Sequence, residues 1–371
     1  MNRADEVLSA IEARCLNSSS VPRIKIKFHQ SRAFVRYKQS KFAECVTDFE
    51  RQEELIIEGA EGFEEAAAGK TEMGFCKSAA LNENIGHCMS SMNKLDQAEK
   101  RFTTALQIIK AAEENQDAPS AGTKCDVGGI YLGLGLVKDR LGNSAGAVPV
   151  LESAVAHYKS VHGADGSSLV AKALSSVGKT KEKCGHDEEA GEHYAEAVAV
   201  FRKTTGRGPL LAGALALFGK NMLRRLQFMA AGKALAEGCD MEVDKDALDL
   251  NSVWEILDNL KRAMLGIVQT KGGVTPDAKE LAGEGFALAE RAIQKAANDW
   301  KEVEGPLNPA THGTTALFEM LAGEFSFANG SLPKAKPHLA NALVIFTRVP
   351  GDTCAGLIST CTQLLAACPP E

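Results

Sequence analysis

A register of small, small, large and small side chains recurs along this chain of 371 residues. In one copy, Gly135 is followed by Ala147, Leu151 and Ala154, at intervals of 12, 4 and 3 residues. The same intervals relate three further sets: Gly86, Ala98, Phe102 and Ala105; Gly178, Ala190, Tyr194 and Ala197; and Gly323, Ala335, Leu339 and Ala342. A glycine costs a helix about 1 kcal/mol relative to alanine. We therefore infer that the glycines allow two helices to approach closely, and that the large residue fills the space beyond.

Two prolines and three weaker copies also bear on the register. Pro149 and Pro337 stand at the same place in two of the stronger copies, early in the second helix, where a proline disturbs a helix least. This coincidence supports the register independently of the glycines. The weaker copies are Ala33, Phe42, Cys45 and Phe49, where Gln52 replaces the last alanine; Gly219, Ala231 and Leu235; and Gly266 with Ala278, the poorest match.

The glycine-rich segment 128–135 also has to be tested as a phosphate-binding loop. A dinucleotide-binding fingerprint needs G-x-G-x-x-G directly after a strand. Gly133 and Gly135 supply the first two glycines, but Lys138 occupies the third position and no β-branched strand precedes them. The fingerprint is therefore excluded, and the glycines are assigned to helix packing.

The composition supports an all-α protein that folds in water. Apolar residues make up 44% of the chain and charged residues 24%, and its longer runs are rich in strong helix formers. The net charge of −6 argues against a dedicated nucleic-acid binder. No run reaches the ~18 apolar residues of a membrane span. Acidic residues near the start argue against a signal or transit peptide, so we expect the cytoplasm or another reducing compartment.

The ten cysteines include no C-x-x-C pair, so neither a zinc site nor a disulfide framework is expected. Cys354, Cys361 and Cys368 recur every seven residues and therefore share one face of a terminal helix. We interpret them as a buried stripe of small apolar side chains, with metal or redox use as the alternative.

The register resembles that of the tetratricopeptide repeat, a helix–turn–helix unit with glycine at position 8, alanine at 20, an aromatic residue at 24 and alanine at 27. Successive glycines from Gly86 to Gly219 are 49, 43 and 41 residues apart, which exceeds the repeat's usual length of about 34 residues. Such lengthened units are similar to the kinesin light chain and nephrocystin type. The resemblance covers about residues 22–350 and implies an all-α, right-handed α-α superhelix of about six to seven repeats.

The resemblance also implies how the chain is divided. A single α-solenoid over 1–371 would comprise an N-terminal helix at 1–21, repeats 1–5 at 22–238, a degenerate repeat at 239–305, a further repeat at 306–350 and a C-terminal capping helix at 351–371. The capping helix is expected because an end repeat must cover its exposed apolar face.

No set of residues forms a recognisable catalytic, cofactor-binding or metal-binding constellation. His186 and His193 are seven residues apart with no third ligand nearby, and Cys184 beside His186 lacks an orienting acid. Asp187 and the two acids after it begin a helix, where acids stabilise the helix dipole. We therefore expect that the protein is not an enzyme and that it uses no cofactor and no metal.

The first repeat contains a basic run, with seven Lys or Arg between Arg23 and Lys41 and no acid. Phe28, Phe34 and Tyr37 are interleaved with these cations. Nucleic-acid binding would explain the pattern, but a solvated amphipathic helix explains it more simply. The rest of the chain offers no second such patch, so no nucleic-acid partner is expected.

In tetratricopeptide repeats, positions 2, 5, 6, 9, 12 and 13 of the first helix line a concave groove. The resemblance assigns ten residues to it: Lys27, Lys38, Asn84, His87, Arg140, Lys172, Lys179, Lys183, Lys220 and Arg224. Only Glu83, Asp139 and Glu182 oppose these cations, which implies a basic groove in an acidic protein. We expect an acidic, extended or helical partner segment to bind there, centred on the fourth and fifth repeats. The alternative is that the lysines are simply solvated.

These features predict a non-catalytic scaffold or adaptor that binds segments of partner polypeptides. Two alternatives stay open. The chain could be a structural subunit of a large multiprotein assembly, which a broadly apolar outer surface would favour. It could also be an enzyme that uses the degenerate region 251–300, which a deep polar pocket with a perturbed acid or histidine would favour.

Overall fold

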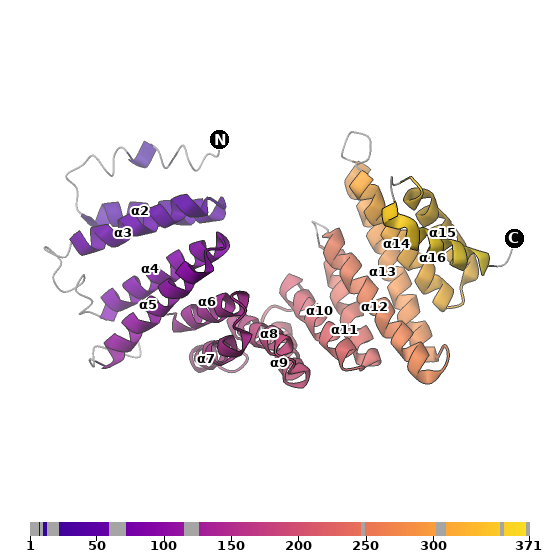
Figure 1. Ribbon diagram of the computed structural model, residues 1–371, viewed down its shortest axis with the longest axis horizontal. Coiled ribbons are helices and arrows are strands. Elements are labelled where there is room, and N and C mark those ends of the chain that lie inside the picture. The colour runs from indigo at the N-terminus through magenta and orange to yellow at the C-terminus, as the bar shows by residue number, and fades with distance from the viewer. Residues whose placement is uncertain are drawn as a thin grey trace. The chain divides into compact units, whose positions relative to one another are not determined.

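The structure is a computed structural model that describes residues 7, 10–12, 22–58, 72–114, 126–245, 249–301, 309–348 and 352–368 (Figure 1). These ranges hold α-helices and a 3-10 helix, and no strand occurs within them. The predicted all-α class is therefore confirmed. None of the helices in these ranges combines the length and the apolar character needed to cross a membrane. The expected N-terminal helix at 1–21 lies outside the described residues, apart from 7 and 10–12.

Most of the helices form pairs that are joined by a short turn. The first helices of the seven pairs are α2 (Pro22–Lys38), α4 (Glu72–Ser91), α6 (Val127–Arg140), α8 (Ser168–Lys183), α10 (Pro209–Arg224), α12 (Leu250–Lys271) and α14 (Pro309–Ala328). The second helices are α3 (Phe42–Glu58), α5 (Leu95–Glu114), α7 (Ser144–His162), α9 (Asp187–Thr204), α11 (Phe228–Val243), α13 (Pro276–Lys301) and α15 (Leu332–Phe346). The 3-10 helix η2 (Asp352–Cys354) and α16 (Ala355–Ala366) follow the last pair.

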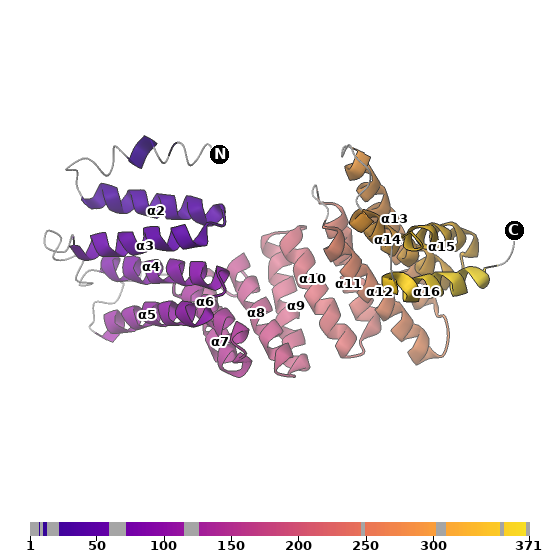
Figure 2. The same cartoon turned by 45° about the horizontal axis from the view of Figure 1, so that its top comes forward.

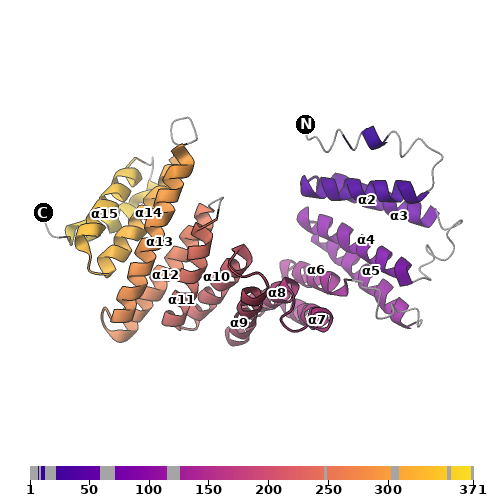
Figure 3. The ribbon, with the colours of Figure 1, turned by 180° about the vertical axis from the view of Figure 1, so that it is seen from behind.

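The helices belong to two compact units. The first unit comprises residues 1–164 and 179–184, and the second comprises 165–178 and 185–371. In the first unit, α2, α3, α4 and α5 lie next to one another in chain order (Figure 2). In the second unit, the helices from α10 to α15 also pack in chain order (Figure 3). The single array over the whole chain, with its internal boundaries, stays a prediction.

The packing glycines lie where the register predicts. A Cβ built on Gly178 would lie 2.8 Å from the ring of Tyr194, the large residue of the same pair, whereas real Cβ atoms essentially never come within 3.0 Å of another atom. The same holds in four more pairs, where the distances are 2.9 Å from Gly86 to Phe102, 2.5 Å from Gly135 to Leu151, 2.6 Å from Gly219 to Leu235 and 2.5 Å from Gly323 to Leu339. In the first pair, Ala33, Cys45 and Phe49 occupy the equivalent positions and are buried. The register is therefore confirmed in six pairs.

The sixth pair, α12–α13, departs from this rule. Gly266 stands at the packing position of α12, but the residue 16 positions later is Ala282, which is too small to fill the space. The ring of Phe228, from the first turn of α11, packs against Gly266 instead. The turn of this pair spans four residues, 272–275, where the other six pairs have three. These two departures explain why the register is weak in the sequence there.

The turn within each of the six regular pairs places one residue in the left-handed region of backbone conformation. It stands seven positions after the packing residue, and its φ is 60° at Ser40, 60° at Asn93, 85° at Gly142, 83° at Gly185, 57° at Leu226 and 82° at Gly330. Leu226 is the costly member, because this conformation costs a residue with a Cβ roughly 1–2 kcal/mol. Its side chain is 71% exposed, so the geometry of the turn, rather than side-chain packing, imposes the conformation.

The three cysteines at the seven-residue spacing are buried, but only Cys361 lies within α16, because Cys354 ends η2 and Cys368 follows α16. Cys354, Cys361 and Cys368 are buried and are free thiols. Cys361 packs in one core with Phe346 of α15. Cys76 on α4 is disulfide-bonded, whereas seven cysteines of the described residues are free thiols. The reducing compartment therefore stays a prediction.

His338 on α15 lies among side chains from three helices of the second unit. Its Nδ1 lies 2.5 Å from Oε2 of Glu319 on α14, and its Nε2 lies 3.8 Å from Oε1 of Glu290 on α13. Its ring packs edge-on against Phe286, and the ammonium of Lys334 lies 5.3 Å from the centre of that ring. The hydrogen bond with Glu319 raises the pKa of His338, and this effect outweighs the opposing effect of burial.

We expect protein stability to fall as the pH rises through the raised pKa of His338. Because this pKa lies above the unfolded value of about 6.5, the stabilisation is complete below that value and is lost above the folded pKa. Thermal melts between about pH 5.5 and 8.5 should therefore show a weaker pH dependence for His338→Gln than for the wild type. An identical pH dependence of the two proteins would contradict this role of His338.

Candidate partner-binding cleft

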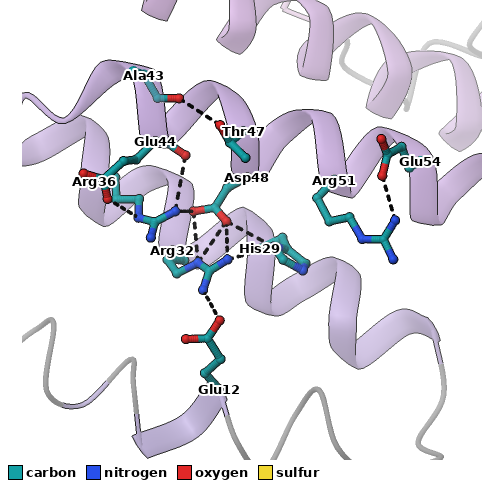
Figure 4. Close-up of polar contacts among 10 residues, drawn as sticks. All are labelled: Glu12, His29, Arg32, Arg36, Ala43, Glu44, Thr47, Asp48, Arg51 and Glu54. Carbon is teal, nitrogen blue, oxygen red and sulfur yellow. Dashed lines mark hydrogen bonds and ion pairs between the residues drawn. The ribbon is translucent and has the colours of Figure 1, made fainter.

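A buried carboxylate binds the basic side chains of the first helix pair (Figure 4). Asp48 on α3 is 1% exposed, and its Oδ1 lies 2.6 Å from Nη2 of Arg32 and 3.1 Å from Nδ1 of His29, both on α2. Its Oδ2 accepts a hydrogen bond of 2.7 Å from Nη1 of Arg36. Burial acts to raise the pKa of Asp48, but the hydrogen bonds from His29 and Arg32 outweigh it, so the pKa lies below its usual value.

This cluster removes part of the basic run from any binding surface. Arg32 also pairs with Glu12, at 2.5 Å between Nη1 and Oε1. Nucleic-acid binding would require the guanidinium groups of Arg32 and Arg36 to face phosphates, but they face carboxylates of the chain itself. Lys27 and Lys38 are exposed and form no ion pair within the described residues.

Two predicted groove residues of the first unit have partners within that unit. Arg140 donates from Nη1 to Oγ of Ser90 at 2.8 Å and from Nη2 to Oδ1 of Asn93 at 3.0 Å, and it thereby fixes the turn after α4. Lys183 donates to Oδ2 of Asp139 at 2.5 Å. These contacts give both cations a structural role.

The other predicted residues of α4 and α8 differ in exposure. His87 is half-buried, with its Nε2 3.6 Å from Oε1 of Glu83, and Asn84 is half-buried beside it. Lys172 and Lys179 are exposed and form no ion pair within the part of the chain that the structure describes.

The last two predicted residues, Lys220 and Arg224, line one cleft in the second unit. The cleft has a volume of about 480 Å³ and lies among α10, α11 and α12. It is lined by Lys220, Leu223, Arg224, Phe228, Trp254, Glu255, Asp258, Asn259 and Arg262. The structure thus brings two of the ten predicted residues together with seven residues that the sequence did not single out.

Charged side chains line the cleft as opposed pairs. Nζ of Lys220 donates to Oε1 of Glu255 across the gap from α10 to α12. Nη2 of Arg262 lies 2.8 Å from Oδ2 of Asp258 on the same helix. With Arg224, three cations face two carboxylates, so the lining has a small positive excess.

Two aromatic rings give the cleft an apolar part. Phe228 is held in place by its contact with Gly266. Trp254 is half-buried, and its Nε1 is buried without a hydrogen-bond partner within the described residues. An unsatisfied buried donor costs about 1–3 kcal/mol. Aromatic side chains beside arginine are the composition typical of binding hot spots.

An ion-pair chain connects the cleft to the next helix pair. Nζ of Lys261 lies 3.5 Å from Oδ1 of Asp258 and 2.9 Å from Oε2 of Glu324 on α14. Burial raises the pKa of Glu324, although the Lys261 ammonium acts in the opposite direction. These contacts hold the cleft side of α12 against α14.

The length of α12 explains why sequence reasoning missed its side of the cleft. This helix has 22 residues, against 16 in α10. Groove positions counted from Gly266 would select six residues, of which Leu260, Ala263, Met264 and Ile267 are buried in the core, and Thr270 and Lys271 lie at the far end of the helix. The cleft residues lie nearer the start of the helix, within 254–262. The signal that could have found them is the polar stripe there, at intervals of three and four residues.

A second pocket, of about 450 Å³, lies between α11 and α13. Burial is the main cause that raises the pKa of its Glu284, and the neighbouring Glu280 adds to it. However, Glu284 is exposed, and Asp240 in the same pocket is bound by Arg291 at 2.6 Å. An exposed glutamate and an ion-paired aspartate differ from the deep polar pocket with a perturbed acid that the enzyme alternative requires. Within the described residues, no group of three or more His, Cys, Asp or Glu could hold a metal.

The sequence matches no protein-family model and no curated protein. Several solved structures are similar. The C-terminal part of a TPR repeat-containing protein from Cytophaga hutchinsonii is 13% identical, with 90% of this chain and 98% of that chain covered and a TM-score of 0.51. BtubC (BKLC) from P. vanneervenii is 16% identical, with 70% and 95% covered and a TM-score of 0.50. The apo form of RapI is 10% identical, with 92% and 80% covered and a TM-score of 0.50. These likenesses show the fold, which is that of tetratricopeptide-like proteins.

Proposed function

We propose that the protein is a non-catalytic scaffold that binds a segment of a partner polypeptide in the cleft among α10, α11 and α12. The cleft itself is the observation that carries the proposal, because it combines concavity, two aromatic rings and three cations. Stacked helix pairs bind extended or helical peptides on surfaces of this kind. The predicted roles of Lys172 and Lys179 in partner binding stay part of the proposal.

We assign to the partner segment an apolar anchor flanked by acidic residues. The anchor would pack against Phe228 and Trp254, which supply the apolar part of the cleft. A partner carboxylate would have to compete with Glu255 for Lys220. A guanidinium carries five N–H donors, so Arg224 can bind a carboxylate and keep its contact with Asp187 at 3.6 Å.

The distribution of exposed apolar side chains favours the cleft over an outer docking surface. Among the described helices, α2 carries three large exposed apolar residues, Ile24, Phe34 and Tyr37, and each later helix carries at most one. Scattered apolar residues of this kind are normal on a protein surface, whereas an assembly interface needs a contiguous patch. The alternative of a structural subunit therefore has less support than the scaffold.

Charge reversal in the cleft should weaken binding of the partner segment. The segment is first recovered by affinity capture with the wild type, then synthesised, labelled and titrated by fluorescence anisotropy. For Lys220→Glu combined with Arg224→Glu, we expect Kd to rise at least about tenfold, because two attractive charges become repulsive. The loss should be larger at low salt, where screening is weakest.

Lys279→Glu is the matched control for this experiment. Lys279 is exposed on α13, away from the cleft lining, and its side chain makes no ion pair within the described ranges. We expect this variant to bind the segment as the wild type does. If the double variant keeps its helical circular dichroism and binds the segment with unchanged Kd, the cleft is not the binding surface.

A further inference from the structure

Two free thiols face each other where the first helix pair packs against the second. Sγ of Cys45 on α3 lies 3.1 Å from Sγ of Cys88 on α4, and both residues are fully buried. That separation is shorter than the ~3.5–4.0 Å at which unbonded carbon atoms pack. Because an S–S bond is about 2.05 Å long, an approach of about 1 Å would bring the two sulfurs to bonding distance.

The repeat register shows that packing alone does not require sulfur at this place. Cys45 occupies the small position of the first pair, and the other six pairs all have a buried alanine there, such as Ala98. Cys88 follows Gly86 by two residues, on the side of α4 that contacts α3. An alanine would therefore fit at Cys45, and the cysteine adds a reactive group to a position that is otherwise inert.

The two thiols differ in acidity because one donates a hydrogen bond to the other. Either sulfur can donate in the hydrogen bond between them. This hydrogen bond lowers the pKa of Cys88 and raises the pKa of Cys45. The thiolate is the form of cysteine that attacks oxidants. Cys88 is therefore the attacking sulfur, and Cys45 is placed to attack second.

We propose that Cys45 and Cys88 form a redox modification site, which hydrogen peroxide converts into a disulfide that ties the first helix pair to the second. The Cys88 thiolate attacks one peroxide oxygen, an S–O bond forms, the O–O bond breaks, and the departing hydroxide takes a proton to become water. The Cys45 sulfur then attacks the sulfenic acid, the S–S bond forms, the S–O bond breaks, and the departing hydroxide takes the proton that Cys45 loses. Two thiols lose two electrons in total, and one peroxide is reduced to two waters.

Local opening of the first pair would give a small oxidant access to the buried sulfurs. In the first unit, α3 packs against its own partner α2 and against α4. Single elements of a folded protein open locally at free energies below that of global unfolding, and such an opening of α3 from α4 would expose both sulfurs. The disulfide would oppose this opening, so oxidation would make the first pair more rigid.

Thiol mapping of the intact protein tests this site. The protein is treated with hydrogen peroxide, the remaining thiols are alkylated, and trypsin is added. Trypsin places Cys45 in peptide 42–51 and Cys88 in peptide 78–94, with one cysteine in each. We expect a cross-linked product of these two peptides that appears with peroxide and disappears on reduction. Cys184, a half-exposed free thiol, shows that the peroxide has acted.

The proposal is wrong if Cys184 is oxidised while Cys45 and Cys88 both remain open to alkylation. Cys45→Ala is the control variant, because alanine fills this position in the other pairs. In that variant, oxidation of Cys88 should stop at a sulfenic acid that dimedone traps. Amide hydrogen exchange in 42–58 should slow at least about tenfold on oxidation of the wild type and not of the variant. A cross-link without slower exchange would also contradict the proposed tie between the pairs.

Discussion

Replacement of Gly178 by leucine should destabilise the protein by roughly 1–3 kcal/mol or more, because it overfills a packed contact. A Cβ at this position would already lie 2.8 Å from the ring of Tyr194, which is fully buried and cannot withdraw. The rest of the leucine side chain would have to push the two helices apart. Thermal melts followed by circular dichroism measure the effect, and each kcal/mol should lower Tm by about 1–2 °C in a chain of 371 residues.

Gly213→Leu is the matched control for that variant. Gly213 lies within α10, is exposed, and a Cβ built on it meets no atom within 4 Å. Leucine is the better helix former, so this substitution should stabilise the protein by up to about 1 kcal/mol. Two glycines inside helices should thus respond with opposite signs. A Gly178→Leu protein that melts at the wild-type temperature would mean that the register does not describe this contact.

Replacement of Asp48 by alanine should cost about 3 kcal/mol, because it removes the buried carboxylate of an ion-pair cluster, although Arg32 keeps Glu12 and Arg36 keeps Glu44. Arg32 and Arg36 have side chains that are 14% and 23% exposed, so water cannot fully replace the lost partner. His29 loses its hydrogen bond as well. Urea unfolding followed by circular dichroism gives the free energy of unfolding for both proteins.

The control and the pH dependence separate this cluster from ordinary surface pairs. Glu54→Ala removes an ion pair with Arg51 whose side chains are 59% and 47% exposed, and it should cost less than about 1 kcal/mol. The pKa of Asp48 is lowered in the folded state. Its stabilisation is therefore present above the unfolded pKa of about 3.9 and is lost as the pH falls through the folded pKa. The stabilities of the wild type and Asp48→Ala should converge in acid, and a constant difference would argue against the cluster.

The sequence predicts the regular helix pairs well because the contact that defines them is local. Gly178 and Tyr194 are 16 residues apart, so one helix–turn–helix unit contains both halves of the contact. The sixth pair could not be found this way, because Phe228 lies 38 residues before Gly266 and belongs to another pair. Its long first helix also shifts Trp254 out of the expected groove positions.

Charge partners were harder to predict than helices. From sequence, the basic run between Arg23 and Lys41 indicates either a solvated helix or a binding surface, because all of its cations lie within one stretch. The carboxylate that binds two of them, Asp48, is on the following helix and has nothing in its own neighbourhood that marks it as buried. Similarly, Lys220 lines a cleft, but its partner Glu255 lies in a stretch where the register fails.

Duplication, deletion or transplantation of single repeats would not affect all seven pairs of this chain alike. Each regular pair contains both members of its own glycine contact, although Phe102 of the second pair also packs on Gly133 of the third. The fifth, sixth and seventh pairs also share such contacts, because Phe228 packs on Gly266, Leu281 on Gly232 and Phe325 on Gly285. Deletion of α12–α13 would therefore leave both Phe228 and Phe325 without their glycine partners. Chimeras with other helical-repeat proteins should therefore move the helices from α10 to α15 together, as the smallest exchangeable block of this part of the chain.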